Sequence, residues 1–99
     1  MAFELIVTPE AAADMDKAFD WYEVQRTGLG SSFLTSVDAS VQAIRRMPTR
    51  FPVVKGEYRR ALVRRFPYAI FFAVIEHVVT IGCVFHTSQN PDKWRDRLG

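Results

Sequence analysis

Cysteine, histidine and the common cofactor-binding motifs are scarce or missing in this sequence. Its 99 residues include one cysteine, Cys83, and two histidines, His77 and His86. A single cysteine excludes an internal disulfide and a cysteine-based zinc site, and the two histidines lack the clustered carboxylates of a metal site. The sequence contains no P-loop, GxGxxG, GxSxG or HExxH motif. We therefore expect neither a metal nor a cofactor.

Long hydrophobic runs are absent as well. The longest apolar stretch, Tyr68–Ile75, is far shorter than the ~20 residues that a membrane-spanning helix needs. The first seven residues contain Glu4 and no basic residue, which is unlike a secretory signal peptide. These features predict a cytoplasmic protein with no membrane span.

The composition is that of one globular domain. Hydrophobic residues make up 48% and charged residues 24% of the chain, which is too apolar for intrinsic disorder. A chain of this length is close to the commonest domain size and buries one core without a deep cavity. We expect residues 1–99 to form a single domain that acts through its surface or a shallow groove.

The formal net charge of +2 conceals a separation of charge along the chain. Residues 1–42 hold two basic and seven acidic side chains, whereas residues 43–75 hold eight basic and one acidic, so their net charges are −5 and +7. The charges of residues 76–99 cancel. The basic segment predicts either a surface for an anionic partner or a solvated face whose arginines pair with neighbouring acids.

Hydrophobic periodicity divides the chain into helices and then strands. Apolar residues recur at helical spacing in the first half and alternate with period two after Gly56. The predicted elements are a strand at 2–7, a helix from Pro9 to a break at 27–30, a helix at about 31–47, a loop at 48–56, strands at 58–64, 68–75 and 78–85, and a short helix from Pro91. This order predicts an α+β fold in which an antiparallel helical hairpin packs on one face of an antiparallel sheet. Trp21 is expected to pack in the core or between helices, and Gly82 to mark a bulge or close contact.

Arginines are concentrated on the strand at 58–64. Alternation places Ala61 and Val63 on one face of this strand and Arg60 and Arg64 on the other. If the helices cover the first face, Arg60 and Arg64 project from the opposite face, close to Arg65 at the following turn. Guanidinium groups in such a cluster bind phosphates or carboxylates, while the alternative is that each pairs with one neighbouring acid.

His86, after the last predicted strand, is the one candidate for acid–base chemistry. Beside a basic strand its imidazole can act as a general acid or base in phosphodiester cleavage, with arginine stabilising negative charge. That reaction needs a second proton-transfer group, and none is evident nearby. The alternative is a hydrogen-bonded structural histidine at a strand end.

Distinctive motifs lie along nearly the whole chain. They are Trp21-Tyr22-Glu23, Gly28-Leu29-Gly30 before Phe33, Pro48 before Phe51-Pro52, Arg64-Arg65-Phe66-Pro67-Tyr68-Ala69-Ile70-Phe71-Phe72, and Val84-Phe85-His86 followed by Pro91, Trp94 and Arg97. In this order and spacing they resemble the RelE/ParE toxin superfamily, and most closely its ParE-like branch. The resemblance implies the same helical hairpin on an antiparallel sheet.

The resemblance also implies a function, that of the toxin in a bacterial type II toxin–antitoxin pair. Such toxins are neutralised by a small antitoxin whose flexible C-terminal segment wraps the toxin, and the two proteins can form higher-order assemblies. ParE-like members poison DNA gyrase, and this is the function we expect. RelE-like members are ribosome-dependent mRNA endonucleases, which is the alternative, together with a non-toxic member that still binds its antitoxin.

Three departures from the family patterns bear on that choice. Ala69 stands where RelE-like nucleases typically carry a basic residue, and the C-terminal tail has no tyrosine, so both favour a protein that is not a nuclease. Gln89 stands where the ParE-like pattern commonly has arginine, which keeps the non-toxic alternative open. Contact with the antitoxin or the target is predicted at Arg60, Arg64, Arg65, Tyr68, His86, Trp94, Arg95 and Arg97. If the protein is a nuclease, His86 is expected to act with Arg64 or Arg65.

Overall fold

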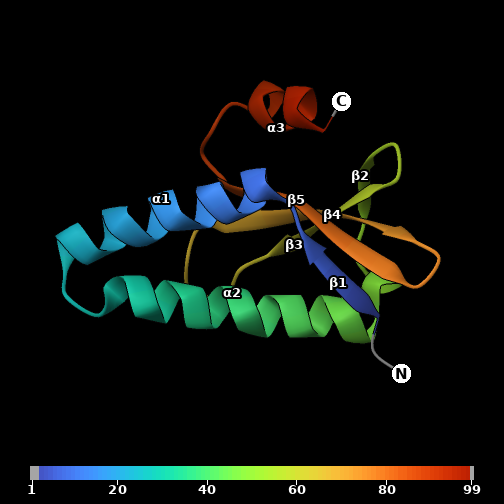
Figure 1. The fold of residues 1–99 in the computed structure, drawn as a ribbon. Helices are drawn as coiled ribbons and strands as arrows, with labels where there is room; N and C mark the ends of the chain where they lie inside the picture. The colour runs from blue at the N-terminus through green and yellow to red at the C-terminus, as the bar shows by residue number, and fades with distance from the viewer. Residues whose placement is uncertain (1–2, 99) are drawn as a thin grey trace.

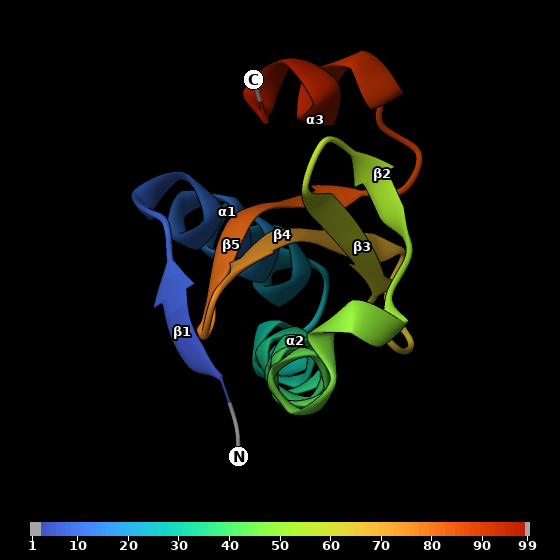
Figure 2. The same ribbon diagram turned by 90° about the vertical axis from the view of Figure 1, so that its right-hand side faces the viewer.

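A five-stranded sheet lies between a helical hairpin and a short C-terminal helix (Figures 1 and 2). The computed structural model describes residues 3–98. Its elements are β1 (Glu4–Val7), α1 (Pro9–Gln25), α2 (Leu29–Arg46), the 3-10 helix η1 (Pro48–Arg50), β2 (Val53–Lys55), β3 (Tyr58–Leu62), β4 (Tyr68–Ile75), β5 (Val78–His86) and α3 (Pro91–Arg97). The predicted α+β fold, with a helical hairpin on one face of the sheet, is confirmed. Within residues 3–98, no helix is both long and apolar enough to span a membrane.

The two long helices begin at local signals in the sequence. The Thr8 hydroxyl accepts a hydrogen bond of 3.1 Å from the Ala11 N–H, and Pro9 occupies the first turn of α1. Near the start of α2, a carboxylate oxygen of Glu23 accepts hydrogen bonds from the N–H groups of Gly28 and Gly30, at 3.0 and 2.8 Å. An acid on α1 therefore satisfies backbone donors at the start of α2 and fixes the turn of the hairpin.

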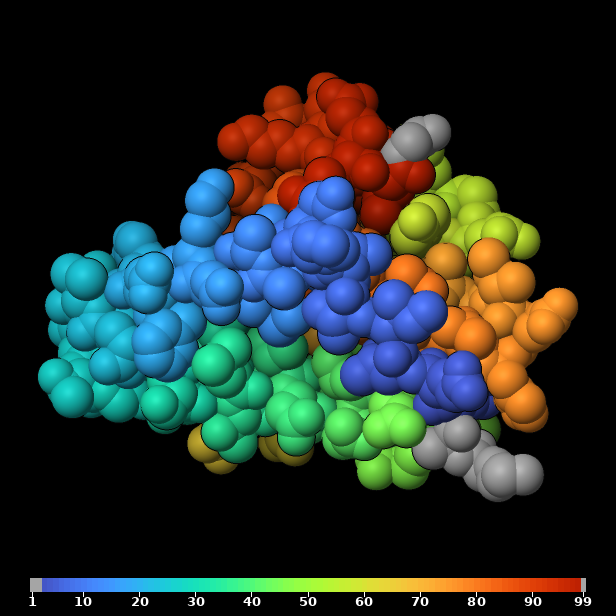
Figure 3. All heavy atoms as spheres, viewed as in Figure 1, coloured from blue at the N-terminus to red at the C-terminus, as the bar shows by residue number. Residues whose placement is uncertain are grey.

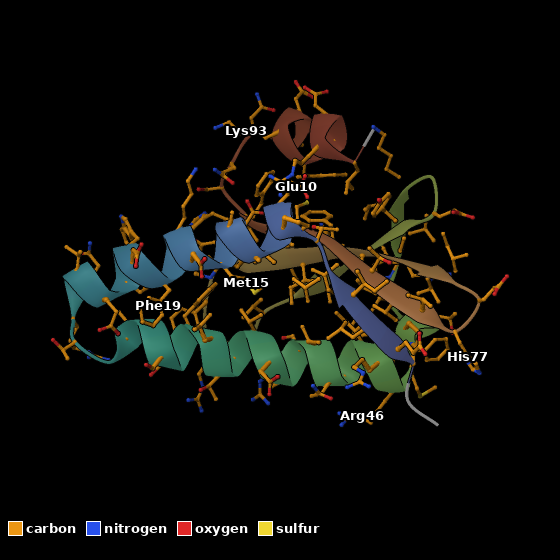
Figure 4. The ribbon with its side chains drawn as sticks, in the orientation of Figure 1. Glu10, Met15, Phe19, Arg46, His77 and Lys93 are labelled. Atoms are coloured by element: carbon orange, nitrogen blue, oxygen red, sulfur yellow. The ribbon has the colours of Figure 1, made fainter. Side chains whose placement is uncertain are left out.

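The hairpin packs closely enough to require a glycine. A Cβ atom on Gly30 would lie 2.8 Å from the Phe19 carbonyl oxygen and 2.7 Å from the Phe19 ring, so α2 meets α1 at a position where only hydrogen fits. In Figure 4, Met15 and Phe19 point from α1 toward α2. The link between the helices also needs a glycine, because Gly28 has a φ of +90°.

The strand order of the sheet is β1-β5-β4-β3-β2. Neighbouring strands are antiparallel with one exception, because β1 pairs parallel to β5. The sheet is therefore mixed, and the first strand of the chain, β1, lies next to the last strand, β5. Two elements differ from those predicted. The edge strand β2 lies within the expected loop at 48–56, and β3 ends at Leu62 and not at Arg64.

Most of the core lies between the sheet and the hairpin. Its largest fully buried side chains include Phe33 and Ile44 from α2, and Ile70 and Phe72 from β4. Ala61 and Val63 join this core, whereas Leu62 between them is 61% exposed, so the alternation predicted across these positions is confirmed. The hairpin consequently covers one face of the sheet.

A smaller core lies on the other face of the sheet, beneath α3. Ala69, Phe71 and Cys83 are buried there, and Trp94 and Leu98 pack against them. No residue of α3 is itself buried, so this helix lies on the sheet as a partial cover.

A bulge in β5 allows this strand to contribute buried side chains to the cores on both faces of the sheet. Phe71 pairs with Cys83 and Phe72 with Ile81, which leaves Gly82 as the extra residue. The extra residue inverts the alternation of β5. A Cβ atom on Gly82 would lie 3.2 Å from side-chain atoms of both Leu98 and Tyr58. Both expectations for Gly82, a bulge and a close contact, are confirmed.

Candidate functional site

Two shallow hollows meet at the C-terminal end of β5. The α1 hollow, of about 240 Å³, lies between α1 and β5 and includes Trp21, Tyr68 and His86 in its lining. The α3 hollow, of about 210 Å³, lies at the edge of α3 and includes Arg60, His86 and Trp94. His86 borders both hollows, so they form one continuous candidate surface.

Trp94 anchors α3 over the second face of the sheet. Its indole stacks on the Phe71 ring, with ring centroids 4.6 Å apart and an angle of 21° between the planes. The Arg95 guanidinium lies 5.2 Å from the Trp94 ring centroid, and the backbone carbonyl of Arg95 accepts a 2.6 Å hydrogen bond from the Lys55 ammonium. The aromatic floor of the α3 hollow is thus bordered by positive charge from Arg60 and Arg95.

The Asp14 carboxylate connects three elements beside this surface. One oxygen accepts hydrogen bonds from Arg97 at 2.7 Å and from the Val84 N–H at 3.0 Å, and the other accepts from Arg97 at 3.3 Å. Because β1 pairs only with residues 78–81 of β5, Val84 lies on a strand edge that β1 does not reach, and Asp14 takes its place as acceptor. The hydrogen bonds that Arg97 donates to Asp14 raise the pKa of Arg97. Figure 3 shows α3 lying directly against the first turns of α1.

His86 has one ring nitrogen occupied within its own turn. Its Nδ1 accepts a hydrogen bond from the Ser88 N–H at 3.0 Å and lies 2.7 Å from the Ser88 hydroxyl oxygen. The neutral ring therefore carries its proton on Nε2. The Tyr68 ring lies edge-on at 5.1 Å, and burial raises the pKa of the Tyr68 hydroxyl, which stays protonated at neutral pH. Together His86 and Tyr68 present hydrogen-bonding groups to the two hollows.

The arginines expected to form one cluster are distributed over three places. Arg60 lines the α3 hollow. Arg64 lies beyond the end of β3 and lines a hollow beside α2, while Arg65 lines another hollow together with Arg26. The strand ends at Leu62, so its alternation does not extend to Arg64, and the expected grouping of the three arginines on one face is wrong.

Five of the eight predicted contact residues nevertheless line the two adjoining hollows: Arg60, Tyr68, His86, Trp94 and Arg95. Arg97 lies beside them and holds α3 to α1. Arg64 and Arg65 do not line a hollow with His86, so the three residues named for the nuclease alternative are not assembled into one site.

Within the part of the chain that the structure describes, residues 43–75 form no ion pair with an acidic side chain. Both ion pairs found within residues 3–98, Arg95 with Asp92 and Arg97 with Asp14, lie outside residues 43–75. Where the basic segment makes side-chain hydrogen bonds, the acceptors are backbone carbonyls, as for Arg45, Lys55 and Arg59. These three cations brace the fold, and the remaining arginines leave an excess of positive charge.

Sequence reasoning missed Asp14 and misplaced Trp21. Asp14 follows Ala11 by three positions and precedes Ala18 by four, so it lies on the buried stripe of α1, and this spacing was the available signal. Trp21 was expected inside, but its side chain is 58% exposed and lines the α1 hollow while its ring contacts Tyr22 edge-on. Within residues 3–98, no group of three or more His, Cys, Asp or Glu residues is placed to hold a metal ion.

Solved structures share the fold of this chain. One is the chromosomal ParDE TA system from P. aeruginosa, with a TM-score of 0.78, 20% sequence identity, and coverage of 88% of this chain and 98% of the other. Another is a mutant of the E. coli toxin RelE in the free state, with a TM-score of 0.71, 17% identity, and coverage of 99% and 96%. No curated protein sequence matches the chain.

The family follows from the sequence itself. The model of the ParE toxin of the type II toxin–antitoxin system parDE matches residues 5–91. The chain therefore belongs to the ParE toxin family, within the RelE/ParE superfamily.

Proposed function

We propose that this protein inhibits DNA gyrase and is held inactive by a cognate antitoxin. Membership of the ParE toxin family supports a toxin of a type II pair. The observation that carries the proposal further is the surface at the end of β5, where an aromatic floor is bordered by the positive charges of Arg60 and Arg95. Such a surface suits a partner segment that offers both apolar and acidic side chains.

The same surface gives the antitoxin a place to act. A partner segment that occupies the α1 and α3 hollows covers Arg60, Tyr68, His86, Trp94 and Arg95 together. If gyrase needs the same residues, a bound antitoxin prevents inhibition by covering them. Arg64 and Arg65 lie apart from this surface, so we assign them no part in it.

A paired assay tests the proposal. Purified protein is added to a gyrase supercoiling reaction and to a translation reaction in which mRNA is examined for cleavage. We expect supercoiling to fall while mRNA stays intact. We also expect the peptide encoded beside this gene, which should be a short antitoxin, to restore supercoiling. Cleaved mRNA with unaffected supercoiling would favour the nuclease alternative instead.

Substitutions in the α3 hollow test whether gyrase inhibition depends on this surface. Arg60→Gln and Arg95→Gln each remove one positive charge from the α3 hollow, and the double variant should raise the inhibitory concentration roughly tenfold or more. Arg50→Gln is the matched control, because Arg50 is exposed on η1 and lines neither hollow. Equal loss of inhibition in the control would mean that total charge, and not this surface, is responsible.

A further inference from the structure

A third hollow lies away from β5, where the α1–α2 link and the β3–β4 turn meet the first half of α2. Its volume is about 550 Å³, larger than the α1 and α3 hollows. Arg26 enters it from the α1–α2 link and Arg65 from the β3–β4 turn. We name it the two-arginine hollow. In Figure 1 the connection between β3 and β4 passes behind the first half of α2.

The two guanidinium groups have no counter-charge within residues 3–98. Neither Arg26 nor Arg65 takes part in an ion pair there, and no acidic side chain lines the hollow. Two positive charges that line one hollow repel each other, and an anion bound in the hollow offsets that repulsion.

The backbone at Arg65 is an independent sign that its side chain is needed there. Arg65 has a φ of +71°, a left-handed conformation that glycine or asparagine adopts with less strain. Strained backbone positions of this kind cluster at active sites, ligand-binding sites and switch regions. The residue at this strained position is an arginine and not a small turn residue, and it lines the hollow.

Hydroxyl groups and apolar atoms complete the lining. The Ser32 and Thr35 hydroxyls donate to helix carbonyls, whereas the hydroxyls of Ser31 and Ser36 have no hydrogen-bond partner within residues 3–98 and remain free to donate. Phe66, which is half-buried, supplies part of an apolar wall.

The backbone N–H groups at the N-terminal end of α2 are not needed to explain the hollow. The N–H groups of Gly28 and Gly30 are already bonded to Glu23, so side chains provide the donors that face the hollow.

We propose that the two-arginine hollow binds a phosphate group, carried either by a nucleic-acid backbone or by a free nucleotide. A guanidinium group binds phosphate oxygens in a bidentate manner, and serine hydroxyls supply further donors. The apolar wall suits the sugar or base attached to the phosphate. The inference is independent of gyrase inhibition, because the hollow shares no residue with the α1 and α3 hollows.

Binding measurements on the full chain test this. The probes are a fluorescein-labelled single-stranded DNA oligonucleotide, its duplex, AMP and inorganic phosphate. We expect Arg26→Gln and Arg65→Gly each to weaken binding roughly tenfold, and to lower the slope of log K against log salt by about 1 for the oligonucleotides. Arg65→Gly keeps the left-handed turn accessible, and circular dichroism checks that both variants are folded. The control is Arg50→Gln, with the same charge change outside the hollow, and its affinity should stay within about twofold of wild type.

The probes separate the two sources of phosphate. Binding of oligonucleotides but not AMP or inorganic phosphate, with loss in both variants, supports a nucleic-acid backbone. Binding of AMP with the same losses supports a free nucleotide. If no probe binds, or if Arg50→Gln loses as much affinity as the other two variants, the proposal is wrong. These outcomes are distinct from a failure of gyrase inhibition, since the supercoiling assay needs none of these probes.

Discussion

At the scale of single residues, Asp14 connects more elements than any catalytic candidate does. Its carboxylate, on α1, holds Arg97 of α3 and the backbone N–H of Val84 in β5. Asp14→Ala leaves a part-buried N–H and a guanidinium without their acceptor, so we expect the free energy of unfolding to fall by about 2–3 kcal/mol. Urea denaturation measures this change.

A neighbouring acid provides the control for that prediction. Asp16 is also on α1 but is exposed, and it has no hydrogen-bond partner within residues 3–98, so Asp16→Ala should change stability by less than about 0.5 kcal/mol. Asp14→Asn keeps an oxygen that can accept from the Val84 N–H, so its loss in the free energy of unfolding should lie between those of Asp14→Ala and Asp16→Ala. A loss for Asp14→Ala no larger than that for Asp16→Ala would contradict the role given to the carboxylate.

The buried thiol of Cys83 leads to a second prediction, on how the stability of the protein depends on pH. Burial raises the pKa of its thiol from 9.0 to about 12, so the folded protein keeps the proton while the unfolded chain begins to lose it near pH 9. Stability from this group is complete below pH 9 and is lost as pH rises toward 12. Burial also raises the pKa of Tyr22 and Tyr68, which act in the same direction at higher pH.

Comparison with Cys83→Ala isolates the thiol from the two tyrosines. The free energy of unfolding of the wild type should fall more steeply between pH 9 and 11 than that of the variant. Thiol reagents should also modify Cys83 only when the chain opens, because its side chain is fully buried. Parallel pH profiles, or rapid modification of the native protein, would be inconsistent with this burial.

What could be predicted for single residues depended on whether an element was regular. Alternation placed Ala61 and Val63 inside correctly because β3 and the residue after it stay extended, while it failed for Arg64, which follows the end of the strand. The convergence of Arg60, His86 and Trp94 on one surface needs contacts between distant segments. Sequence spacing alone contains no such information.

At the scale of elements, the approach of α1 to α2 depends on Gly30. A methyl group there would lie 2.8 Å from a backbone carbonyl oxygen that cannot rotate away, so the two helices must separate. We expect Gly30→Ala to lower the free energy of unfolding by about 1–3 kcal/mol, although alanine favours helix more than glycine does. Thermal and urea denaturation measure whether the free energy of unfolding falls or rises.

The control is Asp38→Ala in the same helix, at an exposed position where alanine should be neutral or slightly stabilising. A stabilised Gly30→Ala protein would show that the helices have room to move.

The helices and the three longer strands could be predicted from periodicity and from proline and glycine signals, because these elements are specified locally. The parallel pairing of β1 with β5 could not, since β1 has no turn that ties it to a neighbour. The edge strand β2 was missed because three residues hold too little pattern to mark a strand. In both cases the pairing partner, and not the segment itself, determines the element.

At the scale of the whole molecule, the two cores make the stability of the protein uneven. The hairpin and the sheet share a large core, whereas α3 has seven residues, none of them buried, and rests on Trp94, Leu98 and the link from Arg97 to Asp14. A helix this short is not stable alone, so α3 should open without unfolding of the rest.

Native-state hydrogen exchange detects that opening. Amides of α3 should exchange much faster than those of β4, whose exchange should require global unfolding. Trp94→Ala removes the stack on Phe71 and should accelerate exchange in α3 further, with a smaller effect on β4. Lys93→Ala is the control, because Lys93 is exposed on the same helix and its loss should leave the exchange of α3 nearly unchanged (Figure 4). Equal exchange rates in α3 and β4 would mean that the two cores unfold as one unit, and that the covered face beneath α3 is reached only through global unfolding.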